Sequence, residues 1–122
     1  MVINEKDHFN FTGEAIKVLN ITTHLGGGLG TAISSYISES KLKHTILELE
    51  KTINPCINQV TLNIKTLAKK TDLINIARQF DVLLLHYHCH PLISWSLFEI
   101  NSHLNTKIAV WCHNNGIDNL HP

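Results

Sequence analysis

One stretch near the start of the chain, from Ile16 to Gly30, joins a strand-like run to a glycine-rich turn and then to a helical pattern. Residues 16–23 are mostly apolar or β-branched, as in a buried strand, and glycine occupies all but one of positions 26–30. Apolar side chains then recur with the period of a helix, at Leu29, Ala32, Ile33, Tyr36 and Ile37. The stretch predicts a strand, a tight turn and the start of a helix.

The glycines of this turn suit a bound ligand as well as a turn. Glycine adopts positive φ readily and lets a ligand approach the backbone without meeting a Cβ atom. The free amide N–H groups and the positive dipole end of a helix attract anions. The turn is therefore a candidate anion site. The alternative is that the glycines serve only a sharp turn and close packing of helix on strand.

Further strands and helices alternate along the rest of the chain. We expect residues 1–15 to be a partly disordered lead-in and residues 16–122 to form one domain. The predicted strands after the first are 43–49, 59–64, 82–85 and 107–112, and the predicted helices are 29–40, 65–80 and 92–101. The run Val82–Leu85 is continuously apolar, which is typical of a parallel strand covered on both faces.

Strands that alternate with helices predict right-handed crossovers and a parallel sheet. The expected fold is Rossmann-like, a three-layer α/β/α domain with a mainly parallel sheet. In such a sheet a ligand binds at the carboxyl ends of the strands, where the strand order reverses. With the order 3-2-1-4-5, the first and fourth strands are neighbours at that point.

The composition narrows the function classes. The chain has 122 residues, is 43% hydrophobic, and balances ten Lys and Arg against ten Asp and Glu. This balance, without a basic patch, argues against a nucleic-acid surface. The longest strongly apolar run is too short to span a bilayer, and no signal-peptide pattern opens the chain. Three cysteines without metal-finger spacing favour a reducing compartment, and we predict a cytoplasmic location.

Polar side chains follow several of the predicted strands. His86, His88 and His90 come after the strand from Val82, and His113 with Asn114 comes after the last strand. Because the carboxyl ends of parallel strands meet at one edge, we expect these side chains to line a crevice with the glycine turn. The alternative is that the histidines are structural or simply solvated at strand ends.

A dinucleotide site is one interpretation of this crevice. Gly26-x-Gly28 opens a helix, and Glu48 or Glu50 follows about twenty residues later, where a carboxylate would bind a ribose. The third glycine of that motif is missing, because Thr31 holds its place.

Metal chemistry is a second interpretation. His86, His88 and His90 alternate, so an extended strand would direct them to one face, as in metal-dependent hydrolases. Pro91 and the helix after it indicate that the run leaves the strand by His88 or Cys89, which breaks the shared face. No carboxylate-rich motif completes the site, so we predict no bound metal and no cofactor.

Three segments together resemble the N-terminal domain of a GT-B glycosyltransferase. They are the strand and helix start around Gly26-Gly27-Gly28-Leu29-Gly30-Thr31, the segment Asp81–His88, and the strand Ile108–Asn114. The chain resembles the retaining, nucleotide-sugar-dependent group that builds polysaccharides and glycolipids, over about residues 16–118.

The resemblance implies roles for individual residues. The loop from Gly26 to Thr31 would approach the donor diphosphate and the acceptor, and His113 would be the catalytic-site histidine beside the transferred sugar. His86, His88 and Asn114 would line the cleft.

The resemblance also implies partners that this chain lacks. The partners of a full-length enzyme are a nucleotide-sugar donor and a glycan or lipid-linked acceptor, with peripheral membrane association at most. The family's C-terminal Rossmann domain, with the nucleotide pocket and a paired-glutamate motif, is absent from these 122 residues. The chain is then half an enzyme, and we expect it to be inactive alone.

Overall fold

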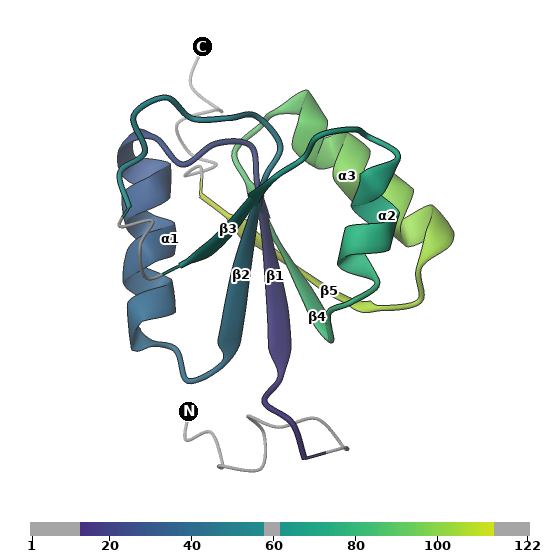
Figure 1. Cartoon of the computed structure of the whole chain (residues 1–122). Coiled ribbons are helices and arrows are strands. Elements are labelled where there is room, and N and C mark those ends of the chain that lie inside the picture. Colours follow the sequence, from purple (N-terminus) through teal and green to yellow (C-terminus); the bar gives the residue numbers. More distant parts are fainter. Residues whose placement is uncertain (1–12, 58–61, 114–122) are drawn as a thin grey trace.

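The computed structural model describes residues 13–57 and 62–113. Five parallel strands form one sheet in the order β3-β2-β1-β4-β5, with α1 on one face and α2 and α3 on the other (Figure 1). The elements are β1 (Lys17–Thr22), α1 (Gly27–Glu39), β2 (Lys43–Glu48), β3 (Asn63–Thr66), α2 (Asp72–Ala77), β4 (Val82–Tyr87), α3 (Pro91–His103) and β5 (Lys107–Cys112). The predicted Rossmann-like α/β/α fold is confirmed, and the strand order is the one for which the first and fourth strands were expected to be neighbours.

The central strands are buried on both faces, as their apolar runs predict. Leu19 and Ile21 of β1 pack with Leu83 and Leu85 of β4 in the core under α2 and α3. A second cluster on the opposite face joins Leu25, Ile33, Ile37 and Ile46 under α1. The alternation along each strand divides its side chains between the two cores, because successive Cβ atoms point to opposite faces.

Helix α1 starts earlier than the sequence pattern predicts. It begins at Gly27, so that its first four residues include three glycines, and the predicted start at Leu29 is wrong by two residues. Gly26 is the N-cap, with an extended backbone at φ −87° and ψ 161°. The apolar period could not show this start, because glycine has no side chain to contribute to the pattern.

The third strand and the second helix also differ from their predicted bounds. The sequence places the strand at 59–64 and the helix at 65–80, whereas β3 occupies Asn63–Thr66 and α2 only Asp72–Ala77. Pairing of Lys65 with Leu47 and of Thr66 with Glu48 keeps these residues in the sheet. Tertiary pairing with β2 thus overrides a helical spacing that is genuine only from Leu73 to Ala77.

The last three elements are close to their predicted positions. Strand β4 continues two residues beyond Leu85 and places His86 within the sheet, opposite Trp111 of β5. Helix α3 begins at Pro91 and extends to His103. Strand β5 matches its predicted bounds, but it is one edge of the sheet, and Val110 is 53% exposed.

Some predictions fall on residues 1–12, 58–61 and 114–122, which lie outside the described residues. These include part of the lead-in, the start of the predicted third strand, and Asn114 as a cleft-lining residue.

No helix in the described ranges has the length and apolar character needed to span a membrane.

Candidate functional site

The glycine turn, the histidine run and His113 lie at the carboxyl edge of the sheet, as predicted. The turn follows β1, the run from His86 to His90 ends β4 and leads into α3, and His113 follows β5. The backbone N–H of His113 donates to the Tyr87 carbonyl oxygen at 2.8 Å, which continues the pairing of β5 with β4. Strands β1 and β4 are neighbours, so this edge includes the point where the strand order reverses.

Contacts from neighbouring segments hold the glycine turn. The N–H of Gly26 donates to His24 Nδ1 at 3.1 Å, and the N–H of Leu25 donates to Thr52 Oγ1 at 2.7 Å. The Leu25 carbonyl accepts from the N–H of Cys56 at 2.8 Å. The loop after β2 therefore fixes the turn from which α1 starts.

The glycines of α1 divide into two kinds. A Cβ atom on Gly30 would lie 2.1 Å from the Leu25 carbonyl oxygen, so this glycine is needed for close packing. Gly27 has φ +56°, and neither Gly27 nor Gly28 has an atom within 4 Å of where a Cβ would be. No side chain caps the helix, and its first turn contains no acidic residue. Among the described residues, the N–H groups of Gly27, Gly28 and Leu29 have no hydrogen-bond partner, as an anion site requires.

A row of hydrogen bonds crosses the sheet on the α1 side. His44 Nδ1 lies 2.9 Å from Asn20 Nδ2, and Asn20 Oδ1 lies 2.9 Å from His86 Nε2. His86 Nδ1 is in turn 2.7 Å from His113 Nε2. At the other end, His44 Nε2 is 2.7 Å from Ser40 Oγ. We call these five residues the sheet relay, because it links β2, β1, β4 and the residue after β5.

The histidines of the relay are held in the neutral form. Burial lowers the pKa of His86 to about 3, and the nearby His113 and His44 contribute to the same direction. Burial also lowers the pKa of His44, and burial followed by His88 lowers the pKa of His113. Near neutral pH these imidazoles therefore act as hydrogen-bonding groups without charge.

His86 and His88 have different environments, although the sequence assigns both to the cleft. His86 is fully buried, and both its ring nitrogens are used within the relay. The ring of His88 meets the ring of His24 edge to face at a centroid distance of 5.3 Å. Both ring nitrogens of His88 are enclosed without a hydrogen-bond partner among the described residues, and burial lowers its pKa.

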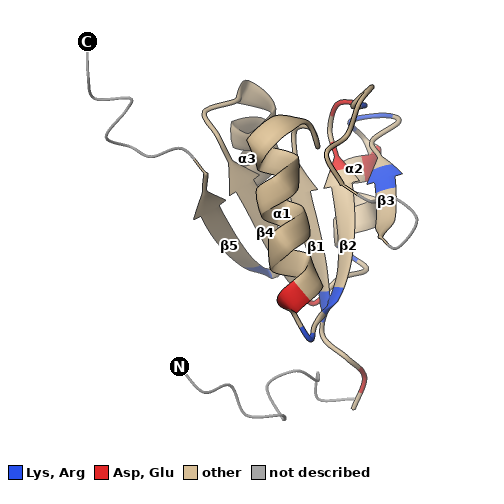
Figure 2. Cartoon of the chain, turned by 90° about the vertical axis from the view of Figure 1, so that its left-hand side faces the viewer, with Lys and Arg blue, Asp and Glu red and all other residues tan. Residues whose placement is uncertain are grey.

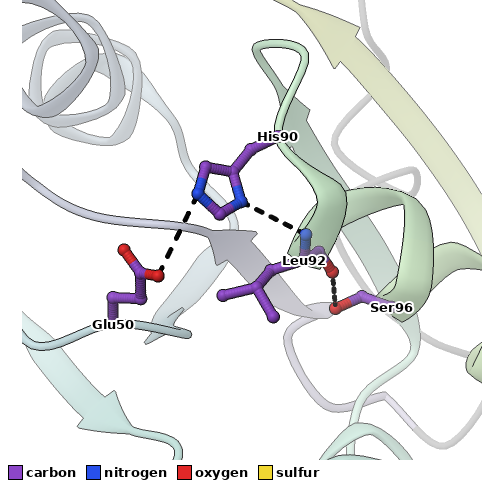
Figure 3. A network of polar contacts seen from close by, with 4 residues as sticks. All are labelled: Glu50, His90, Leu92 and Ser96. Atoms are coloured by element: carbon purple, nitrogen blue, oxygen red, sulfur yellow. Dashed lines mark hydrogen bonds and ion pairs between the residues drawn. The ribbon is translucent and has the colours of Figure 1, made fainter.

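His90 has a structural role at the start of α3. Its Nδ1 accepts from the N–H of Leu92 at 3.2 Å, which caps the helix, and its Nε2 lies 4.0 Å from Glu50 Oε1 (Figure 3). The strand ends at Tyr87, and Cys89 takes φ +60°, so the chain turns before His90. The predicted break in the shared face of His86, His88 and His90 is therefore confirmed.

An aromatic surface adjoins His113. The ring of Trp111 lies 4.2 Å from that of His113 at an interplanar angle of 30°, and Tyr36 of α1 meets Trp111 edge to face at 5.5 Å. Figure 2 shows α1 across the middle of the sheet with β5 outside it, and the upper parts of α1, β4 and β5 carry no charged residues. An apolar ring beside an imidazole is a surface that suits a neutral, hydroxyl-rich ligand.

Of the two carboxylates proposed for a dinucleotide site, Glu48 is occupied by neighbouring side chains and Glu50 is exposed. Glu48 is buried, and its two carboxylate oxygens accept from Thr52 Oγ1 at 3.1 Å and Thr66 Oγ1 at 2.9 Å, so it is not free to bind a ribose. Within the described ranges, no three histidine, cysteine or acidic side chains are grouped as metal ligands.

Four residues of the site were not predicted from the sequence, namely Asn20, Ser40, His44 and Trp111. Asn20 was detectable, because a polar amide in the middle of an apolar central strand needs a buried partner. His44 and Trp111 gave no such signal, since their contacts depend on strand pairing between β2 and β1 and between β4 and β5.

The fold defines the class of the protein, a small α/β domain with Rossmann-like topology. No family model, curated protein or solved structure matches the chain.

Proposed function

We propose that the chain is the N-terminal domain of a retaining, nucleotide-sugar-dependent glycosyltransferase. The observation that supports this most is the presence of two surfaces at the same edge of the sheet. One is the uncapped start of α1 at Gly27 and Gly28, and the other is His113 beside Trp111. The first suits a diphosphate and the second suits a sugar ring.

The chemistry of such a transfer matches these groups. Retaining transfer proceeds through an oxocarbenium-like state while negative charge develops on the leaving diphosphate. Donors that are already aimed at developing charge contribute most to catalysis. The backbone N–H groups of Gly27, Gly28 and Leu29 are donors of this kind, and their fixed position at a helix start avoids reorganisation during the reaction.

His113 serves the sugar side in this proposal. Its backbone is held by Tyr87 and its ring by His86 and Trp111, so the imidazole has a defined orientation. A held imidazole can bind a hydroxyl of the transferred sugar or of the acceptor. We assign His113 this binding role and no proton-transfer step.

The test uses calorimetry and a transfer assay on the isolated chain. Each hydrogen bond to a diphosphate from one open side nets only about 0.5–1.5 kcal/mol, against an association cost of roughly 4 kcal/mol or more. We expect dissociation constants for nucleoside diphosphates and their sugars no better than millimolar, and no sugar transfer. Micromolar binding that disappears when Gly27 and Gly28 are replaced by bulky residues would instead indicate a self-contained nucleotide-binding module.

A further inference from the structure

A backbone carbonyl oxygen determines which groups donate and which accept hydrogen bonds along the sheet relay. Asn20 Nδ2 lies 3.3 Å from the buried carbonyl oxygen of Thr45 and 2.9 Å from His44 Nδ1. A carbonyl oxygen can only accept, so the NH₂ group of Asn20 has to face Thr45. The amide oxygen of Asn20 then faces His86, and the orientation of the amide is fixed by the backbone of β2.

This orientation determines the proton positions of the next two residues. Asn20 Oδ1 only accepts, so His86 donates from Nε2 across the 2.9 Å contact. Because His86 is neutral, its Nδ1 carries no proton and accepts across the 2.7 Å contact with His113. His113 must therefore donate from Nε2, and in its neutral form its Nδ1 is bare.

We infer that Asn20 and His86 are positioning residues that hold His113 in the Nε2–H tautomer, with Nδ1 presented as an acceptor. Among the described residues Nδ1 of His113 has no hydrogen-bond partner, and it is not enclosed as the ring nitrogens of His88 are. An unprotonated ring nitrogen accepts a hydrogen bond from a donor, such as a sugar hydroxyl, and repels a phosphate oxygen. The inference rests on the proposed function and deepens it. It assigns binding of a sugar hydroxyl to His113 and binding of the diphosphate to the start of α1.

Nitrogen NMR of the histidine rings tests the tautomer without any ligand. Protonated and bare ring nitrogens of neutral imidazole have widely separated ¹⁵N shifts. At pH 7.5 the wild-type chain should show protonated Nε2 and bare Nδ1 for both His86 and His113. A protonated Nδ1 on His113 would overturn the inference, and failure of nucleotide binding would not affect this result.

Two variants separate positioning from general packing. In Asn20→Leu the acceptor for His86 is lost, so both tautomers of His113 become populated and its two ring nitrogens move toward average shifts. In His44→Phe the Thr45 carbonyl still orients the Asn20 amide, so the shifts of His113 stay as in the wild type. Unchanged shifts of His113 in a folded Asn20→Leu chain would contradict the inference. Should that variant not fold, the wild-type tautomer and the His44→Phe chain still decide it.

Inorganic pyrophosphate tests the division of ligands. At pH 7.5 the inference predicts that added pyrophosphate leaves the Nδ1 shift of His113 unchanged, whether or not it binds at α1. Movement of that nitrogen toward the protonated position on addition of pyrophosphate would show that His113 recognises the anion, and would overturn the assignment.

Discussion

His86 is a fully buried imidazole in the middle of a parallel sheet, with both ring nitrogens bonded to other side chains. A buried imidazole in such a row keeps its place only while it is neutral, because the protonated form would face His113 with a second donor. The same burial that lowers its pKa to about 3 therefore makes the fold sensitive to acid.

We predict that His86 contributes to the loss of stability at acid pH. Its pKa is lower in the folded than in the unfolded chain, so the unfolded chain binds the additional proton between these values. The contribution of His86 to the free energy of unfolding is complete above about pH 6.5. It is lost as the pH falls toward 3, by roughly 4–5 kcal/mol over the whole window.

Urea unfolding between pH 7 and pH 4.5 measures this effect. In His86→Gln the number of protons taken up on unfolding near pH 5 should fall by about one relative to wild type. His103→Gln, at the exposed end of α3, is the control for replacing a histidine outside the relay. If the free energy of unfolding changed with pH equally in the wild type and in His86→Gln, His86 would not be held neutral by its surroundings.

At the scale of the element, the start of α1 contains two kinds of glycine. Gly30 is needed for close packing, whereas Gly27 and Gly28 have open space where a Cβ atom would be. Gly30 approaches the Leu25 carbonyl, which itself accepts from the N–H of Cys56. Gly28 has helical position and open space around its Cα atom. Gly30 and Gly28 therefore form a matched pair in one helix, one where a Cβ atom would clash and one where it would not.

Alanine substitutions should act in opposite directions at these sites. Gly30→Ala forces a Cβ atom into the Leu25 carbonyl, and we expect a loss of about 1–3 kcal/mol, as for overpacking. Gly28→Ala reduces the entropy of the unfolded chain and should stabilise by about 0.4–1 kcal/mol. Denaturant midpoints of the two variants measure this difference. A destabilised Gly28→Ala would mean that the first turn is not helical at that position.

The elements differ in how far their sequence determines them. The apolar runs of β1 and β4 predict their positions well, because these strands are buried, whereas the run of β5 predicts its bounds although the strand is an exposed sheet edge. The pattern fails around Lys65 and Thr66, which have helical spacing and yet pair with β2. The site is predictable where chemistry follows a strand end, as at His113. It is unpredictable where it depends on which strands pair, as for the contact between Asn20 and His44.

At the scale of the whole molecule, the nine histidines raise the question of metal. His86 uses both ring nitrogens within the relay, and His90 uses Nδ1 to cap α3. We predict no stoichiometric zinc, and elemental analysis of the purified chain is the measurement. About one zinc per chain would contradict this and favour the metal-dependent hydrolase interpretation.

The central claim is that the start of α1 receives a diphosphate at the carboxyl edge of the sheet. Amide NMR of the isolated chain, titrated with uridine, guanosine and thymidine diphosphates and their sugars, tests this claim most directly. We predict saturable shifts at Gly27, Gly28 and Leu29 with at least one of these ligands, at dissociation constants in the millimolar range. The absence of shifts at these three amides with every ligand, or saturable shifts confined to other parts of the chain, would contradict the proposed function.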